Sequence, residues 1–337
     1  MAQEQLFRRP FYAKDGKTRL PQYVAHRGFN RIYPENTKSA FTAAIDVGCH
    51  GIETDVQITK DGVVVISHDS SLNRCFGIDK LIKDCDWEYL STLWTTREPR
   101  ERMLRLSDLL DFLNAPSNAH VWVLLDIKRN NDVKVIIKKI AEVVKSGPYA
   151  SQPWYSRIVL GCWTPAYFPS CKEHLPDFQA ALIGYNVVGA RNVLHTVPSI
   201  SFNTHFKSVK GPLGYGFVDA VHGNKNSEDG KRKLIFTWTV NAARDMRWAI
   251  RNNFDAILTD DPALCKQICD SWDDAYAQRH EADDNRVTLG ERLHLALWGF
   301  WFTFFSWVFP IVYPYLQRFM QEKPTVRTEI NGSTSRT

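Results

Sequence analysis

Short apolar runs that alternate with helix-like stretches between residues 23 and 272 constrain the fold most strongly. Gly51–Gln57 and Val121–Ile127 are rich in β-branched residues and typical of buried strands, whereas Thr37–Val47 and Val133–Val144 have apolar residues at helical spacing. Roughly eight strand–helix pairs over about 250 residues predict an α/β fold, a closed parallel (β/α)8 barrel of the TIM type. An open doubly wound sheet is the alternative, but the sequence lacks the glycine-rich dinucleotide fingerprint that usually accompanies it. Further strands are predicted at Tyr23–Ala25, Val63–Ser67, Ile158–Gly161, Ala180–Ile183, Ile200–Asn203, Lys233–Val240 and Ala256–Thr259, and further helices at Ala242–Asn252 and Pro262–Ser271.

Composition bounds the class of protein. Of the 337 residues, 44% are apolar and 23% charged, so a sizeable core can form. The net charge of +5 fits an anionic substrate, a membrane surface or simply a basic soluble enzyme, and it lacks the clustered basicity of a nucleic-acid binder. The seven cysteines form no CxxC pair and are odd in number, which argues against a disulfide framework or structural zinc and favours a reducing, cytosolic compartment.

The sequence divides into a barrel and flanking segments. The N-terminus has no continuous apolar run, so it is not a secretory signal, and we expect residues 1–22 to form an unstructured arm. Residues 23–272 carry the barrel pattern. Residues 273–292 are polar with charges of both signs and are predicted to be a linker.

Residues 293–316 contain no Asp, Glu, Lys or Arg and are rich in aromatic residues. A helix of about 24 residues spans about 36 Å, enough for a hydrocarbon core of about 30 Å. We therefore predict a membrane segment, either a tail anchor or, because Pro310 and Pro314 interrupt it, a kinked piece within one leaflet. The alternative is a helix packed on the barrel. Residues 317–337 are expected to be a disordered polar tail.

Two carboxylates and a third, more distant one form a candidate metal site. Glu53 and Asp55 stand two residues apart on a predicted strand, so both point to one face. Two anions side by side repel each other unless a cation or proton lies between them. Asp126, at another strand end, would supply a third oxygen ligand for one divalent cation, Mg²⁺ or Ca²⁺. The alternative is a solvated strand face.

Two histidines and two cations complete the candidate site. His26 and His68 each end an apolar strand, and histidine suits both the proton removal and the proton donation of phosphodiester cleavage. Arg27 could bind phosphate oxygens bidentately and Lys128 as a point charge, although either could be a surface cation. Trp238 is predicted to line the substrate pocket, with core packing as its alternative.

Residues 26–74 read HRGFNRIYPENTKSAFTAAIDVGCHGIETDVQITKDGVVVISHDSSLNR, which resembles the glycerophosphodiester phosphodiesterase family at many polar positions. LLDIK at 124–128, TWTVN at 237–241 and LTDDP at 258–262 extend the resemblance over roughly 23–272. The resemblance implies a TIM-type barrel, a divalent metal, His26 and His68 as acid and base, Glu53 and Asp55 as metal ligands, Arg27 on the phosphate and Glu35 in support. Asp126 falls where many members have Glu, which makes it the least secure ligand.

The Asp-Ile-Lys motif and the apolar C-terminal segment look most like the fungal phosphatidylglycerol phospholipase C branch. That likeness implies cleavage of phosphatidylglycerol to diacylglycerol and glycerol 3-phosphate. We hypothesise that the headgroup 2-hydroxyl attacks phosphorus within the same molecule and that water then opens the resulting cyclic glycerol phosphate. We expect a phospholipid and a membrane as partners, with the catalytic domain facing the cytosol; no nucleic acid is expected and no protein partner is indicated. The alternatives are a glycerophosphodiesterase or lysophospholipase D acting on soluble or lyso substrates, and a non-catalytic barrel that binds anionic lipid.

Overall fold

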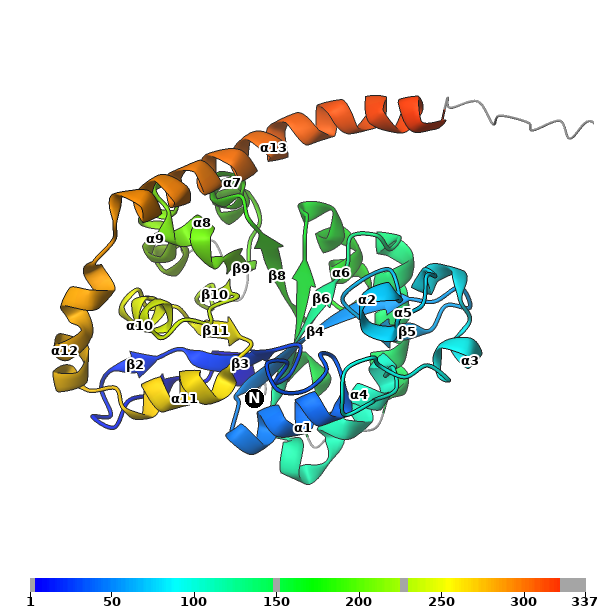
Figure 1. Ribbon diagram of the computed structural model, residues 1–337, viewed down its shortest axis with the longest axis horizontal. Coiled ribbons are helices and arrows are strands. Elements are labelled where there is room, and N and C mark those ends of the chain that lie inside the picture. The colour runs from blue at the N-terminus through cyan, green and yellow to red at the C-terminus, as the bar shows by residue number, and fades with distance from the viewer. Residues whose placement is uncertain (1–3, 148–151, 225–229, 322–337) are drawn as a thin grey trace, which may run out of the picture.

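A closed barrel of parallel strands forms the centre of the molecule (Figure 1). The computed structural model describes residues 4–147, 152–224 and 230–321, and for residues 285, 306, 307 and 309–321 it describes the backbone alone. Within this part, eight parallel strands follow each other around the barrel, and β3 pairs with both β11 and β4 to close it. The TIM-type prediction is therefore confirmed. The strands are β3 (Gln22–His26), β4 (Gly51–Ile58), β6 (Trp122–Ile127), β7 (Ile158–Cys162), β8 (Gln179–Gly184), β9 (Ser201–His205), β10 (Ile235–Trp238) and β11 (Ala256–Thr259).

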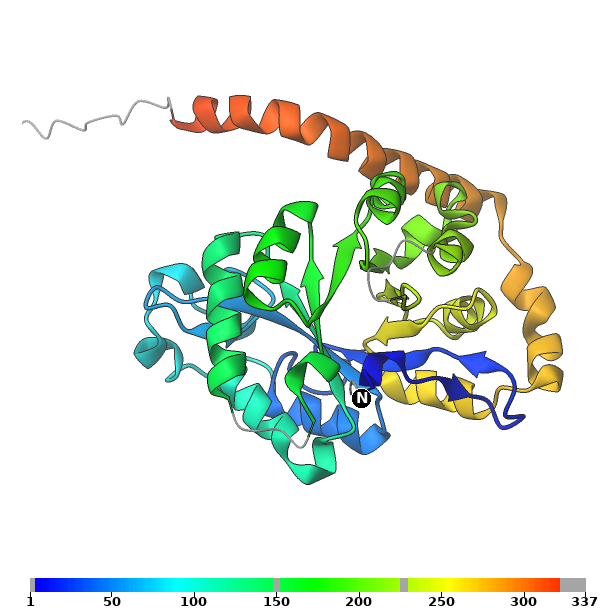
Figure 2. The same ribbon diagram turned by 180° about the vertical axis from the view of Figure 1, so that it is seen from behind.

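Helices surround the barrel, as both views show (Figures 1 and 2). Local signals bound α1 (Lys38–Val47), because Thr37 caps its first turn through Ala40 N, and Gly48, at φ 92°, ends it. A short insertion between β4 and α4 (Leu106–Asn114) contains β5 (Val64–Ile66), which pairs antiparallel with β4, together with α2 (Asn73–Phe76) and α3 (Trp87–Leu90). The longer helices are α1 (Lys38–Val47), α4 (Leu106–Asn114), α5 (Val133–Ser146), α6 (Phe168–His174), α7 (Val187–Thr196), α8 (Phe206–Lys210), α9 (Phe217–Gly223), α10 (Ala243–Arg251) and α11 (Pro262–Asp270).

Strand alternation decides which residues enter the barrel. Ile52 and Val56 of β4 belong to the large apolar core under the helices, so Glu53 and Asp55 between them point to the barrel interior. On β6, Trp122 and Leu124 belong to the inner core, which places Asp126 on the same inner face. The sheet register sets Asp55 directly beside Asp126. Local alternation and register together thus gather three carboxylates inside the barrel.

The N-terminal segment is folded, so the prediction of an unstructured arm is wrong for its described residues. It forms a short 3-10 turn, η1 (Leu6–Arg8), and a hairpin of β1 (Phe11–Tyr12) and β2 (Arg19–Leu20). Leu6 and Phe7 are each 2% exposed and pack in the inner core with Trp122 and Phe236. Burying such side chains contributes about 1.5–3 kcal/mol each, which explains why a segment without strong local propensity becomes ordered.

The predicted polar linker also has regular structure. Residues 274–285 form α12 (Asp274–Asn285), which packs on α10. Arg247 of α10 donates to Asp284 of α12 at 2.7 Å, and Arg251 binds the same carboxylate. Both Arg247 and Asp284 are buried, so a buried ion pair between two polar-looking segments holds this helix in place.

The C-terminal helix α13 (Leu289–Gln321) starts alongside the barrel and extends past it (Figures 1 and 2). Its first half contacts α7, α8 and the 3-10 turn η6 (Pro212–Gly214), as the packing alternative predicted. In the described part of the chain, no helix has both the length and the apolar character that a membrane crossing requires. The prediction that residues 293–316 span a membrane is therefore not supported. The predicted polar tail begins within α13, and its residues 322–337 lie outside the described residues.

A buried carboxylate stabilises the amino-terminal side of β11. Asp255 has a 1% exposed side chain that accepts from Arg19 at 2.8 Å, from Ile235 N at 2.8 Å and from Arg232, and it lies 3.1 Å from His222 Nε2. Burial alone would raise the pKa of Asp255, but the hydrogen bond from His222 and the positive charges of Arg232 and Arg19 outweigh it and lower the pKa.

Replacing Asp255 with Asn is expected to lower the free energy of unfolding by about 2 kcal/mol at pH 7, because charge-assisted bonds are lost while the partly exposed arginines can turn to water. Since the folded pKa lies below the unfolded value of about 3.9, this contribution is present above pH 4 and is lost as the pH falls through the folded pKa. Urea unfolding at pH 7 and pH 3 should therefore show a smaller difference at pH 3. Asp46→Asn on the exposed face of α1 is the control; an equal loss in both variants would contradict the prediction.

Candidate active site

The tight turn after β3 places a histidine and an arginine at the barrel mouth. His26 is the last residue of β3, and Arg27 and Gly28 follow with positive φ angles of 57° and 77°. A Cβ at Gly28 would lie 2.8 Å from Ala40, so only glycine fits there. The turn directs the backbone N–H of Arg27 to Glu53 Oε2 at 3.0 Å. The His-Arg-Gly motif is thus a structural requirement as well as a source of functional groups.

Glu53, Asp55 and Asp126 converge inside the mouth. One oxygen from each lies within 4.8 Å of the others, and the residues are only 3%, 1% and 5% exposed. Burial, together with the adjacent charge of Asp55, raises the pKa of Glu53 to about 8. A group of buried, mutually repelling oxygen donors is what a hard divalent cation stabilises, so these residues fit Mg²⁺ or Ca²⁺.

Lys128 contacts two of these carboxylates. Its Nζ lies 2.7 Å from Asp55 Oδ1 and 2.6 Å from Asp126 Oδ2. Burial would raise the pKa of Asp55, but Lys128 and Arg27 outweigh it and lower the pKa; for Asp126 burial prevails and the pKa is raised. The pKa of Lys128 itself is raised, since both carboxylates outweigh the effect of its burial. In the structure Lys128 thus binds Asp55 and Asp126, and its predicted contact with phosphate stays a prediction.

Each of the two histidines is held by a carboxylate at its Nδ1 atom. His26 Nδ1 lies 2.7 Å from Asp260 Oδ1, and its Nε2 lies 3.9 Å from Glu53 Oε2. His68, which follows β5, has its Nδ1 2.6 Å from Asp69 Oδ1. Burial would lower the pKa of His26, but Glu53 and Asp260 outweigh it and raise the pKa, whereas burial lowers the pKa of His68. A carboxylate on Nδ1 fixes the ring and leaves proton transfer to Nε2.

Arg27 and Glu35 belong to an ion-pair network beside this site. Arg27 Nη1 lies 3.2 Å from Glu35 Oε1, and its Nε lies 3.4 Å from Asp55 Oδ2. Arg74 binds Glu35 at 2.7 Å and Asp69 at 2.6 Å. It therefore connects Glu35, which contacts Arg27, with Asp69, which contacts His68. The arrangement matches the supporting role that the sequence resemblance implies for Glu35.

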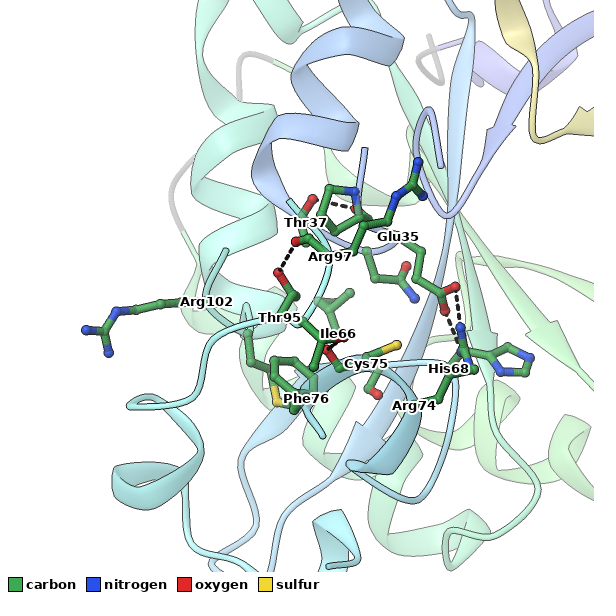
Figure 3. A pocket seen from close by; sticks show the side chains of 15 residues that line it. Glu35, Thr37, Ile66, His68, Arg74, Cys75, Phe76, Thr95, Arg97 and Arg102 are labelled. Atoms are coloured by element: carbon green, nitrogen blue, oxygen red, sulfur yellow. Dashed lines mark hydrogen bonds and ion pairs between the residues drawn. The ribbon is translucent and has the colours of Figure 1, made fainter. Parts of the chain in front are cut away.

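A cavity of about 170 Å³ borders the network and includes His68 and Glu35 in its lining, but not the three carboxylates (Figure 3). In this view Glu35 and Arg74 meet beside His68, while Cys75 and Phe76 lie away from the imidazole. The cavity therefore lies to one side of the site, next to His68 and Glu35, and not at the three carboxylates.

Aromatic rings occupy the other side of the mouth. Four consecutive strands, β7 to β10, end on or are followed by Trp163, Tyr185, His205 and Trp238, which we call the aromatic rim. Ring centroids lie 5.7 Å apart for Trp163 and Trp238, 5.2 Å for Tyr185 and Trp238, and 4.9 Å for Tyr185 and His205. Trp163 Nε1 donates to Asp126 Oδ1 at 2.6 Å, which joins the rim to the carboxylates. Trp238, predicted to line the pocket, lies in this rim and donates to the carbonyl of Asn203 at 3.0 Å.

The structure thus brings the predicted charged residues together. We call six of them the charged half: His26, Arg27, Glu53, Asp55, Asp126 and Lys128. Glu35 and His68 lie beside it. Sequence reasoning missed Asp260, which also accepts hydrogen bonds from Asn30 and Asn241, and the other three residues of the rim. A usable signal existed, because Asp260 comes directly after a predicted barrel strand and Trp163 and Tyr185 come two residues after the ends of two others, where such barrels place functional groups.

Comparisons with known proteins agree with this geometry. The model of the glycerophosphoryl diester phosphodiesterase family matches residues 26–264. A glycerophosphodiester phosphodiesterase from Bacillus altitudinis is 26% identical over 258 residues, 74% of this chain and 98% of the relative. A lysophospholipase D from Homo sapiens is 35% identical over 138 residues, 37% of this chain and 41% of the relative.

Two solved structures show the same fold. A phosphodiesterase from Oleispira antarctica, in complex with the product sn-glycerol-3-phosphate, has a TM-score of 0.60 at 20% identity and covers 75% of this chain and 98% of its own. A glycerophosphodiester phosphodiesterase from Thermotoga maritima has a TM-score of 0.58 at 21% identity, with 74% and 98% covered. Given the match over 26–264, this chain belongs to the glycerophosphoryl diester phosphodiesterase family and is a hydrolase of phosphodiesters, in a family whose enzymes depend on a divalent metal ion.

Proposed function

We propose that this enzyme cleaves a phospholipid with a glycerol headgroup, phosphatidylglycerol, to diacylglycerol and glycerol 3-phosphate. The observation that carries the proposal is the division of one barrel mouth into a charged half and an aromatic rim, joined through Trp163 and Asp126. A phosphodiester of a lipid has the matching division, with an anionic phosphate next to an apolar alcohol. The product named for the Oleispira antarctica structure, sn-glycerol-3-phosphate, is a glycerol phosphate, the class of phosphate-bearing product expected here.

The charged half supplies groups for each part of the reaction. Glu53, Asp55 and Asp126 would hold the divalent cation, which when bound neutralises phosphate charge. Arg27, at the edge of these carboxylates, offers a planar fork of donors to the phosphate oxygens. Lys128 offsets the charge of the two aspartates that it contacts and keeps them in place.

The two histidines move the protons. One takes the proton of the headgroup 2-hydroxyl, whose oxygen forms a new bond to phosphorus within the same molecule and gains from proximity. The other protonates the diacylglycerol oxygen as its bond to phosphorus breaks. Water then opens the cyclic glycerol phosphate. Asp260 and Asp69 hold the imidazoles at Nδ1 so that Nε2 of each can transfer a proton.

The attack by the 2-hydroxyl gives a direct test. A phosphatidylglycerol analogue with a 2-deoxy headgroup should bind but turn over at least about 10³-fold more slowly, because the internal nucleophile is missing. Turnover is measured by mass spectrometry of the products, and competition against the natural substrate checks binding. Normal turnover of the analogue would exclude this route, and water would then be the nucleophile.

A second candidate function, cleavage of lyso or soluble substrates on the other side of phosphorus, is favoured by the human relative named lysophospholipase D. Product identity separates the two. Diacylglycerol and glycerol 3-phosphate support the first function, whereas phosphatidic or lysophosphatidic acid and a free alcohol support the second. The non-catalytic alternative is excluded by membership of this enzyme family together with retention of the histidines and acidic ligands.

We further propose that the enzyme binds a membrane surface, with its catalytic domain facing the cytosol. One face of α13 exposes a stripe that includes Phe300, Trp301, Phe304 and Phe305, which are 41–65% exposed. Leu213 of η6, a turn that contacts α13, is exposed as well. No acidic residue occurs between Arg292 and Gln321, which suits an anionic interface. All seven cysteines are free, in keeping with the cytosolic side.

A further inference from the structure

The opposite face of α13 packs on the aromatic rim. Trp298 is stacked on His205 with ring centroids 5.0 Å apart and an interplanar angle of 21°. One turn further, Phe302 is stacked on Tyr185 at 4.4 Å and 15°. Both rings are partly exposed, so each has surface left for a ligand. These two residues extend the rim from the barrel strands onto the C-terminal helix.

The extended rim is continuous with the site of chemistry. From Phe302 the contacts run through Tyr185 and Trp238 to Trp163, whose indole N–H binds the predicted metal ligand Asp126. The ammonium of Lys128 lies 5.8 Å from the centroid of Trp163. A substrate with its phosphate at the carboxylates would therefore meet aromatic surface on this side.

His205 adds to the apolar character of the rim. Its ring lies between Tyr185, Trp238 and Trp298, at 4.9, 5.1 and 5.0 Å. Its Nδ1 is buried and has no hydrogen-bond partner among the described residues. Burial, with a smaller effect of Lys207, lowers the pKa of His205 to about 4, so the imidazole is uncharged at neutral pH. An uncharged ring allows the rim to contact hydrocarbon without burying a charge.

We propose that Trp298 and Phe302 are specificity-determining residues that contact the acyl portion of the substrate, so that α13 is part of the substrate site and not only a surface element. This inference rests on the proposed function, because it assumes a phosphodiester with an acylated alcohol. The continuity of the rings with the carboxylates argues for substrate as the occupant. The exposed stripe of α13 faces away from the barrel. With that stripe on a lipid surface, Trp298 and Phe302 would lie between the lipid and the three carboxylates.

The helix contains its own matched control. Trp301 and Phe305 repeat the Trp–Phe pair at the same spacing on the exposed face, with ring centroids 4.6 Å apart. The inner variant is Trp298→Ala with Phe302→Ala, and the outer variant is Trp301→Ala with Phe305→Ala, both in the full-length protein. Trp298→Phe with Phe302→Leu keeps apolar contact and tests whether it suffices.

Three measurements distinguish the two faces. The first two are kcat/KM on monomeric dihexanoyl phosphatidylglycerol and on its deacylated form, glycerophosphoglycerol; the third is co-sedimentation with vesicles that contain phosphatidylglycerol. The inner variant should lose about tenfold or more on the dihexanoyl substrate, mainly through KM, stay within about twofold on the deacylated one, and still bind vesicles. The conservative variant should recover most of the loss. The outer variant should lose vesicle binding and keep both activities.

Equal activity of the inner variant and wild type on the dihexanoyl substrate would overturn the inference and leave the proposed function intact. An equal loss on both substrates would also overturn it, because the two rings would then act through the structure of the mouth alone. Wild-type enzyme that cleaves glycerophosphoglycerol but no acylated substrate would instead overturn the proposed function. Unchanged vesicle binding by the outer variant would contradict the proposed membrane surface.

Discussion

Replacing His26 with Gln is expected to lower kcat by about 10³-fold, with little change in KM, because glutamine keeps a polar side chain of similar size but cannot transfer a proton. His26 lies at the end of β3 between Asp260 and Glu53, and its orientation is fixed through Nδ1. His68→Gln should have an effect of the same order, since each histidine serves one of two proton transfers. Steady-state kinetics on dihexanoyl phosphatidylglycerol measure both variants.

His120→Gln provides the matched control, because His120 is exposed and is not part of the site. It should retain wild-type kcat. Circular dichroism checks that the variants remain folded. If folded His26→Gln kept kcat within about fivefold of wild type, His26 would not be an acid or base in the reaction, and the role of the charged half would have to be reassigned.

Removing one carboxylate of the triad is expected to weaken divalent-cation binding strongly and to lower activity with it. Asp55→Asn should weaken cation affinity by about 10²-fold or more, because Asp55 is one of the three clustered carboxylates, lies beside Asp126 in the sheet register and is the least exposed of the three. Chelator should inactivate the wild-type enzyme, and added Mg²⁺ or Ca²⁺ should restore it. Isothermal titration calorimetry measures affinity independently of turnover.

Thermal unfolding gives a second readout that needs no substrate. A cation at 100 times its dissociation constant stabilises the folded wild type by about 2.7 kcal/mol, so its Tm should rise, while that of Asp55→Asn should not. The exposed Asp86→Asn is the control and should behave as wild type. Unchanged cation affinity in Asp55→Asn would show that the ion binds elsewhere.

Local pattern was sufficient to predict the barrel and most of the charged half. Gly51–Gln57 and Val121–Ile127 are buried and contain several β-branched residues. The alternation of Ile52 and Val56 with Glu53 and Asp55 indicates which side chains enter the barrel. The His-Arg-Gly turn is equally local, since Gly28 must fit against Ala40. Where backbone geometry and side-chain period decide the outcome, a single sequence contains the information.

The elements that were mispredicted depend on distant partners. Leu6 and Phe7 are ordered because the inner core accepts them, and α12 is held by the pairing of Asp284 with Arg247, thirty-seven positions away. The contact of Lys128 with Asp55 was not foreseen for the same reason, since it depends on the register of β4 and β6, which cannot be derived from a single sequence; its phosphate-binding role stays a prediction. The aromatic rim was missed for the same reason, since its rings come from four strands and α13.

The central claim is that a divalent cation binds among Glu53, Asp55 and Asp126, with His26 and His68 near the phosphate. The most direct test is an anomalous difference map from a crystal soaked in Mn²⁺, a cation that oxygen ligands also bind. The account predicts a peak about 2.0–2.6 Å from carboxylate oxygens of these three residues. A Mn²⁺ peak only at other residues, or none at the triad when the soaked enzyme is active, would contradict it.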